Sequence, residues 1–262
     1  MSWLKNIIFR LTIEQWLIID DDYIKPEFRS DLKCISTIIL ITLVLVIQKY
    51  FGQSKHFTQA FGQFVVNIPL SGVYPRLYMT FMCLILYMII PFIFIRIVLK
   101  GNIREYGFTL RGFSRYIPMY LIMFGVMLPI LIGVSFSERF YNHYPLYYGA
   151  GESFLSLSIW EISYGLYFLA LEFFLRGFMV FALARYIGSY AIFVMVIPYV
   201  MIHFGKPFAE TIGSIIAGIA LGTLSLRTGS IFGGVFIHIT IAWGMDILAL
   251  LQKGQLQSLF FR

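Results

Sequence analysis

Two opposite charges lie within an apolar run in the sequence LALEFFLRGFM, residues 169–179. Glu172 and Arg176 are four residues apart, so on a helix they share one face, with the glutamate nearer the N-terminus, the better order for an ion pair. Two charges near the centre of a membrane helix cost about 5–7 kcal/mol together on insertion scales before compensation. We therefore expect the pair to face a bundle interior, either as a structural salt bridge or as part of a functional site.

Two histidines occur in later apolar runs. His203 follows Tyr199 by one helical turn in YVMIHFGKP, and His238 lies in the middle of GGVFIHITIAWGMD. Asp246 lies two turns beyond His238 on the same helical face. A histidine at the centre of a membrane span is a candidate functional residue, whereas His203 alone, near a helix end, is a weaker signal.

These residue types permit hydrolysis by an activated water. A carboxylate and a histidine can hold and deprotonate the water, and a second histidine can donate to a developing oxyanion. Glu161, three turns before Glu172 on the same face, would line the approach to this site. Glu172, His203 and His238 also belong to the types that bind a divalent metal, but no HExxH spacing occurs, so metal dependence stays open.

The composition predicts an integral membrane protein. The chain has 262 residues, of which 59% are hydrophobic and 13% charged, with a mean hydropathy of +0.81. A soluble domain of this length would carry far more charge. The net charge of +7 comes from basic residues at the ends of apolar runs, so membrane topology explains it and we expect no nucleic-acid partner.

The predicted fold is an all-α, polytopic transmembrane helical bundle of about seven to eight spans, with glycines such as Gly218, Gly222 and Gly234 letting the later helices approach closely. The seven predicted spans are 34–51, 77–99, 116–136, 159–185, 188–204, 209–226 and 229–251. An eighth would require part of 52–75 or 137–158 to enter the bilayer.

Three regions follow from this pattern. Residues 1–33 form an interfacial amphipathic segment, in which Trp3, Leu4, Ile7, Ile8, Leu11 and Trp16 alternate with Lys5 and Arg10. Residues 34–154 form N-terminal transmembrane helices, and residues 155–251 form a core in which the intramembrane polar residues collect. The base-rich stretch 96–115 predicts that this loop and the N-terminus are cytoplasmic.

The order and spacing of the polar residues in 155–250 resemble the CPBP family, membrane proteins related to type II CAAX prenyl endopeptidases and to bacteriocin-processing and immunity proteins. The family motifs EExxxR, FxxxH and HxxxN are similar here to LEFFLR, YVMIH and HITIA. The resemblance implies an intramembrane protease in which Glu172 and His203 activate water, His238 stabilises the oxyanion and Arg176 orients Glu172. It also implies a membrane peptide or protein substrate and a bacterial inner membrane.

Two positions depart from the family pattern. Leu171 stands where the family has its first glutamate, and Ala242 stands where it has the asparagine of the third motif. Neither side chain can activate water or donate a hydrogen bond. A catalytically silent relative that binds a membrane partner or acts in immunity is therefore the alternative, and a small transporter or channel is the third class.

Overall fold

The computed structural model describes residues 9–10, 13–23, 32–111 and 113–256, and the regular structure of these residues is entirely helical. The predicted all-α class is confirmed. In the described residues, six helices are long and apolar enough to cross a membrane: Leu32–Tyr50, Ser71–Leu99, Phe113–Ser135, Phe154–Ile187, Phe208–Thr228 and Phe232–Gln252. The chain is an integral membrane protein.

The predicted count of seven to eight spans exceeds the six that the structure describes, because the segment 188–204 is only partly helical. Its helix, α11 (Tyr190–Met201), has 12 residues. Beyond Met201 the N–H of His203 bonds to the carbonyl of Val200 at 2.9 Å, a turn that ends the helix within a still apolar sequence. Apart from the beginnings of the membrane-crossing helices Ser71–Leu99 and Phe154–Ile187, the segments considered for an eighth span hold short helices: α4 (Ser54–Val65), α8 (Glu138–His143) and η6 (Tyr148–Gly151).

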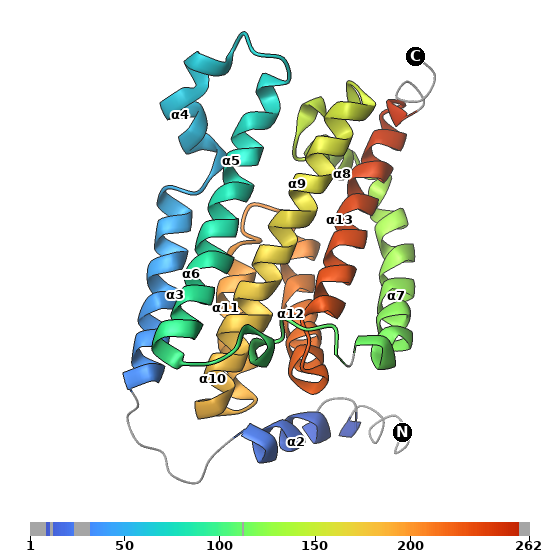
Figure 1. Ribbon diagram of the computed structural model, residues 1–262. Helices are drawn as coiled ribbons and strands as arrows, with labels where there is room; N and C mark the ends of the chain where they lie inside the picture. Colours follow the sequence, from blue (N-terminus) through green and yellow to red (C-terminus); the bar gives the residue numbers. More distant parts are fainter. Residues whose placement is uncertain (1–8, 11–12, 24–31, 112, 257–262) are drawn as a thin grey trace. The chain divides into compact units, whose positions relative to one another are not determined.

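The chain folds into two compact units that interleave along the sequence, so that α3 (Leu32–Tyr50), α9 (Phe154–Glu172) and α13 (Phe232–Gln252) each contribute to both. Unit 1 comprises residues 1–42, 91–116 and 172–234, and unit 2 comprises residues 43–90, 117–171 and 235–262. The helices are traced in chain order in Figure 1.

Unit 1 contains most of the polar residues singled out from the sequence. Its helices are α2 (Ile13–Tyr23), α6 (Ile90–Phe94, from residue 91), η3 (Ile95–Leu99), η4 (Ile103–Tyr106), η5 (Phe113–Tyr116), η7 (Phe173–Met179), α10 (Val180–Ile187), α11 and α12 (Phe208–Thr228), with the first part of α3 and the start of α13.

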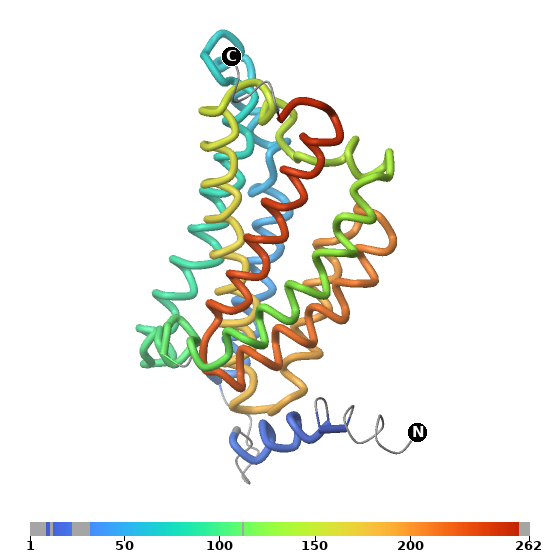
Figure 2. The backbone as a smooth tube through the Cα atoms, turned by 90° about the vertical axis from the view of Figure 1, so that its right-hand side faces the viewer, coloured from blue at the N-terminus to red at the C-terminus, as the bar shows by residue number. Residues whose placement is uncertain are grey.

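Helix α2 lies crosswise at the ends of α10 and α12 (Figures 1 and 2). The indole N–H of Trp16 donates to the Thr223 hydroxyl at 3.2 Å, and the backbone N–H of Ser189 donates to Asp20 at 2.6 Å. Such an orientation suits the interfacial helix predicted here. The aromatic and apolar residues at positions 3, 4, 7, 8 and 11 of the predicted segment lie outside the described residues.

Glycines allow α11 and α12 to pack side by side (Figure 2). A Cβ atom at Gly218 would lie 3.0 Å from the Tyr199 ring, and one at Gly222 would lie 2.9 Å from Ile192. Both distances are shorter than side chains normally tolerate. The predicted close approach of these helices therefore fixes the position of Tyr199.

Unit 2 is built around an aromatic core. Its helices are the second part of α3, α4, η1 (Ser71–Val73), α5 (Tyr74–Cys83), η2 (Leu84–Ile89), α7 (Ile117–Ser135), α8, η6, and the parts of α9 and α13 within 154–171 and 235–252. The buried core includes Trp160 and Tyr164, stacked with 4.6 Å between ring centres, and Ala242 packs in the same cluster.

Candidate functional site

The charged pair expected from the sequence is fully buried in unit 1. Glu172 is the last residue of α9, and Arg176 lies in η7, a segment of π-helix. Nη1 of Arg176 lies 2.8 Å from Oε1 of Glu172, and neither side chain has exposed surface. Segments of π-helix are rare and recur at functional sites. The i, i+4 spacing thus correctly indicated an ion pair, while the π-helical backbone beneath it was not foreseen.

Tyr199 and His203 extend this pair into a row of four contacting residues. The guanidinium carbon of Arg176 lies 3.8 Å from the centre of the Tyr199 ring, a cation–π contact. Tyr199 also contacts His203, whose ring centre is 4.7 Å away at an interplanar angle of 73°. The structure therefore brings Glu172, Arg176, Tyr199 and His203 together within unit 1.

The orientation of His203 determines which of its nitrogens can take up a proton. Its Nδ1 lies 2.8 Å from the carbonyl oxygen of Tyr199. A carbonyl can only accept a hydrogen bond, so in this contact Nδ1 carries the proton and donates. Nε2 is then the basic nitrogen of the neutral ring, as a group that receives a proton from water requires.

Neighbouring helices hold the pair in place. The hydroxyl of Ser225 donates to the backbone carbonyl of Arg176 at 3.0 Å. At Gly234, in the first turn of α13, an added Cβ would overlap the carboxylate of Glu172. The carboxylate thus occupies the space that a side chain at position 234 would need. Glycine at this position is a requirement of the buried pair, and the glycine-rich sequence before His238 was the signal for it.

The remaining predicted residues lie in unit 2. His238 is half-buried in α13, and its ring stacks on Phe168 with 5.1 Å between centres. Asp246 is fully buried and accepts a hydrogen bond of 2.6 Å from the indole of Trp160. The carboxylate oxygens of Glu161 are also buried, close enough to Asp246 for an electrostatic interaction.

Sequence reasoning missed Trp160 as the partner of Asp246. The two residues are 86 positions apart, and Asp246 was grouped only with His238 because they share a helical face. A buried tryptophan usually finds an acceptor for its N–H, and this was the available signal. Asp246 anchors α13 to α9 within unit 2 through this bond.

The two positions that depart from the family motifs are buried and apolar. Leu171 is 3% exposed, and Ala242 is equally buried in the aromatic core of unit 2. Their packing leaves Glu172 as the carboxylate of the first motif. It also means that the third motif contributes His238 without a polar residue one turn later.

The donors considered for a metal do not form a metal-binding cluster. Among the described residues, no group of three or more His, Cys, Asp or Glu side chains has the arrangement needed to hold a metal ion. In unit 1 the carboxylate of Glu172 faces Arg176, whose positive charge competes with a cation for the same oxygens. We derive no step through a metal.

The helices and the buried pair define a polytopic membrane protein with a fully buried Glu–Arg contact in its second half. Comparison with known proteins agrees: residues 143–244 match the family described as Type II CAAX prenyl endopeptidase Rce1-like. The chain therefore carries a domain of the Rce1-like, or CPBP, family over these residues. No curated protein and no solved structure matched the chain.

The matched segment contains all three sequence motifs. It includes Glu161, the Glu172–Arg176 pair, Tyr199, His203 and His238, and it ends two residues before Asp246. The predicted family is confirmed on this segment, which covers the part of the chain in which the polar residues collect. Residues 1–142 lie outside the match.

Proposed function

We propose that the protein is an intramembrane endopeptidase that hydrolyses a peptide bond of a membrane-embedded or membrane-proximal substrate. The observation that carries the proposal is the buried Glu172–Arg176 pair, continued through Tyr199 to His203. A purely structural pair would not need a histidine in contact with the same tyrosine. The match to a family named for endopeptidases supports the same class of reaction.

In the proposed reaction, a water attacks the carbonyl carbon of the scissile peptide. Glu172 and His203 hold the water, and one of them takes its proton as the C–O bond forms. That proton then passes to the leaving amine when the C–N bond breaks, so no other reactant is consumed. Arg176 orients the carboxylate of Glu172 through the 2.8 Å contact.

His238 receives its proposed role from the family motif. As a hydrogen-bond donor it would stabilise the oxyanion of the tetrahedral intermediate. Because Ala242 replaces the polar residue that accompanies this histidine in the family pattern, His238 would supply that stabilisation alone. Removing a single oxyanion donor commonly slows turnover by about 100- to 1,000-fold, which sets the effect to expect for His238→Ala.

The alternative is a catalytically silent relative that binds a membrane peptide or partner protein, including in immunity. The observation in its favour is the apolar packing of Leu171 and Ala242, both 3% exposed. In this case the Glu172–Arg176 pair would serve only to fix helix packing.

The variant Glu172→Gln distinguishes the two proposed functions, because it keeps the shape of the side chain but removes its basicity. The full chain would be incubated in membranes with a farnesylated CAAX peptide and with the same peptide lacking the prenyl group, while its abundance is measured in parallel. We expect the wild type to cleave at least one peptide and Glu172→Gln to lose at least about 100-fold of this activity at equal abundance. Comparing the two peptides then shows whether the prenyl group is required.

Glu105→Gln is the matched control, because Glu105 also pairs with an arginine but is exposed. It should keep full activity. Cleavage by Glu172→Gln at the wild-type rate would refute the proposed role of this carboxylate. If Glu172→Gln disappears from the membrane, His238→Ala provides the decision. A loss of cleavage of about 100- to 1,000-fold at equal abundance would support the proposed protease, undiminished cleavage would refute the oxyanion role of His238, and absence of cleavage by the wild type would favour the silent relative.

The proposed setting is a bacterial inner membrane with the N-terminus and the base-rich loop 96–115 in the cytoplasm. The charge distribution supports this orientation. The stretch 96–115 contains one acidic residue, Glu105, and five basic residues: Arg96, Lys100, Arg104, Arg111 and Arg115. Labelling of single cysteines introduced at exposed positions such as Arg111 and Arg139 would test the orientation, since only one of the two should react from outside intact cells.

A further inference from the structure

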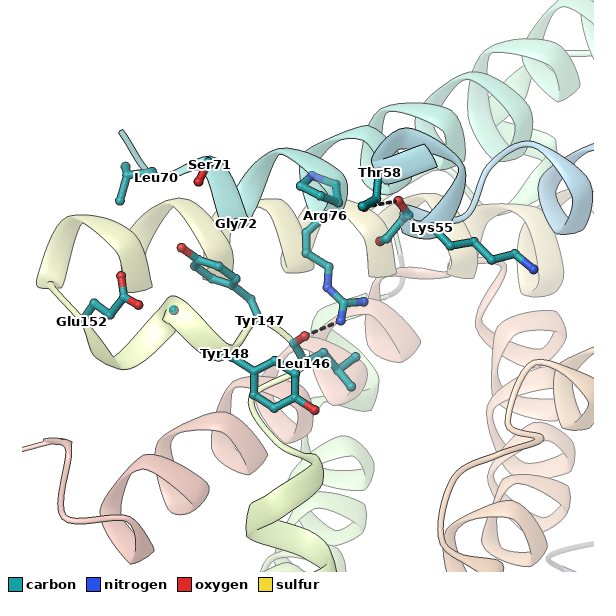
Figure 3. A pocket seen from close by; sticks show the side chains of 13 residues that line it. Lys55, Thr58, Leu70, Ser71, Gly72, Arg76, Leu146, Tyr147, Tyr148 and Glu152 are labelled. Carbon is teal, nitrogen blue, oxygen red and sulfur yellow. Dashed lines mark hydrogen bonds between the residues drawn. The ribbon is translucent and has the colours of Figure 1, made fainter. Parts of the chain in front are cut away.

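A cavity of about 540 Å³ lies in unit 2, apart from the residues proposed to be catalytic. It is an open pocket bordered by the start of α4, by η1 with the first turn of α5, and by residues 146–149 (Figure 3). The side chains that line it include Lys55, Arg76, Tyr147, Tyr148 and Glu152. The lining thus includes cations, hydroxyl groups and aromatic rings, with Arg76 beside Leu146 and Tyr148 and the Lys55 side chain extending away from them (Figure 3).

Arg76 is the central group of this cavity. It lies in the first turn of α5, at the beginning of the membrane-crossing helix Ser71–Leu99. Its guanidinium donates to the backbone carbonyl of Leu146, and Figure 3 shows this bond beside the ring of Tyr148. A guanidinium has five N–H donors, and the bond to Leu146 uses one of them, so Arg76 can offer others to a ligand in the cavity that it lines.

The charges around the cavity favour an anion at Arg76. Lys55 and Arg76 supply two positive charges, whereas Glu152 is the one acidic side chain in the described lining. In Figure 3, Glu152 lies at the opposite end of the group from Lys55, beyond Tyr147. Asp246 also interacts electrostatically with Arg76, but from α13, which does not line the cavity.

The position of the cavity suits a group at the surface of the bilayer. Two membrane-crossing helices, Ser71–Leu99 and Phe154–Ile187, begin beside it. Helix α4 has no buried residue, and it exposes Phe61 and Phe64 to the surroundings. Such an amphipathic helix rests at the boundary between headgroups and acyl chains.

We propose that this cavity binds a phosphate-type anion, with Arg76 as the principal contact and Lys55 as a second cation. Arginine matches phosphate oxygens with two parallel N–H donors, and the cavity lining also carries hydroxyl groups, among them that of Tyr148. The phosphate could come from a phospholipid headgroup or from a free phosphate ester. The site is independent of the proposed protease reaction.

The test is binding of phosphatidylglycerol to the purified full chain in a neutral detergent, followed by native mass spectrometry over a lipid titration. We expect Arg76→Gln to weaken binding at least about tenfold, because a charged hydrogen-bonding partner is lost. Lys55→Gln should weaken it less. Arg139→Gln is the matched control, since Arg139 is exposed on α8 and does not line the cavity, and its affinity should equal that of the wild type.

A second variant guards against a folding defect in Arg76→Gln. Thr58 lines the cavity, so Thr58→Phe fills part of it without changing any charge. The hydrogen bond that this variant removes is local, from the Thr58 hydroxyl to the backbone carbonyl of Ser54. It should also reduce lipid binding. Competition of the bound lipid by millimolar glycerol phosphate or inorganic phosphate would identify a free phosphate ester as the natural source, and its absence would identify the headgroup. Unchanged binding by both Arg76→Gln and Thr58→Phe would overturn the proposal.

Discussion

Unit 1 contains two glutamate–arginine pairs of similar construction and opposite surroundings. Glu172 and Arg176 are 2.8 Å apart with both side chains fully buried, whereas Glu105 and Arg185 are 3.3 Å apart with side chains 54% and 41% exposed. Each arginine also lies over a tyrosine ring, Tyr199 at 3.8 Å and Tyr106 at 4.9 Å. Burial, and not the residue types, separates the two pairs.

The difference shows that the free-energy cost of losing one partner of an ion pair depends on burial. Water screens the exposed pair, and such pairs contribute about 0–1 kcal/mol to stability. At this site burial raises the pKa of the Tyr106 hydroxyl while Arg185 partly opposes the change, so the ring under Arg185 stays neutral at physiological pH. Neither side chain of the buried pair has exposed surface, so bulk solvent does not solvate one member when the other is lost, and each depends on the other.

The largest effect is expected from Arg176→Met, which leaves the carboxylate of Glu172 buried without its cation. We expect a loss of about 3–5 kcal/mol in the free energy of unfolding, measured by denaturant titration in detergent. The double variant with Glu172→Gln removes both charges and should recover much of this loss. Equal losses in the single and double variants would show that the buried pair is not coupled.

A smaller effect is expected from Gly234→Ala, because the new Cβ would overlap the carboxylate of Glu172. Arg176 holds this carboxylate in a fully buried position, so it cannot move aside freely. We expect a loss of about 1–3 kcal/mol, typical of overpacking, in the same unfolding assay. Gly213→Ala is the control, since a Cβ there meets nothing within 4 Å, and it should be neutral or stabilising. An unchanged free energy of unfolding for Gly234→Ala would show that the Glu172 carboxylate can move aside at no cost, contrary to the prediction.

The smallest effect is expected from Glu105→Gln in the exposed pair. Its loss should not exceed about 1 kcal/mol, because water solvates Arg185 when its partner is gone. Thermal unfolding of Glu105→Gln and Arg176→Met, measured in parallel with the wild type, compares the two losses of stability directly. A loss as large as that of Arg176→Met would remove the distinction between the two pairs.

The sequence predicted the buried pair better than its surroundings. Glu172 and Arg176 were visible because charge is rare in an apolar run and because four residues make one helical turn. The contact of Arg176 with Tyr199 joins different helices, and no spacing along the chain encodes it. The same limit hid the bond between Trp160 and Asp246.

A hydropathy pattern also does not predict where α11 ends. Residues 188–204 are apolar almost throughout, so their hydropathy predicts one membrane span. Hydropathy reports which side chains tolerate lipid, but not where backbone hydrogen bonds change from one pattern to another. The turn at Val200–His203 is such a change, and it depends on contacts such as the bond from the Thr211 hydroxyl to the His203 carbonyl at 3.0 Å.

The 12 residues of α11 have a consequence for the lipid around the protein. A helix of this length rises about 18 Å, whereas the hydrocarbon core of a bilayer is about 30 Å thick. Its outward residues Val194, Ile197 and Met201 are exposed and apolar, so acyl chains meet this helix over less than the full thickness. Local thinning of the bilayer is one way in which a helix this short is matched, and it would bring headgroups and water closer to His203, just beyond the end of α11.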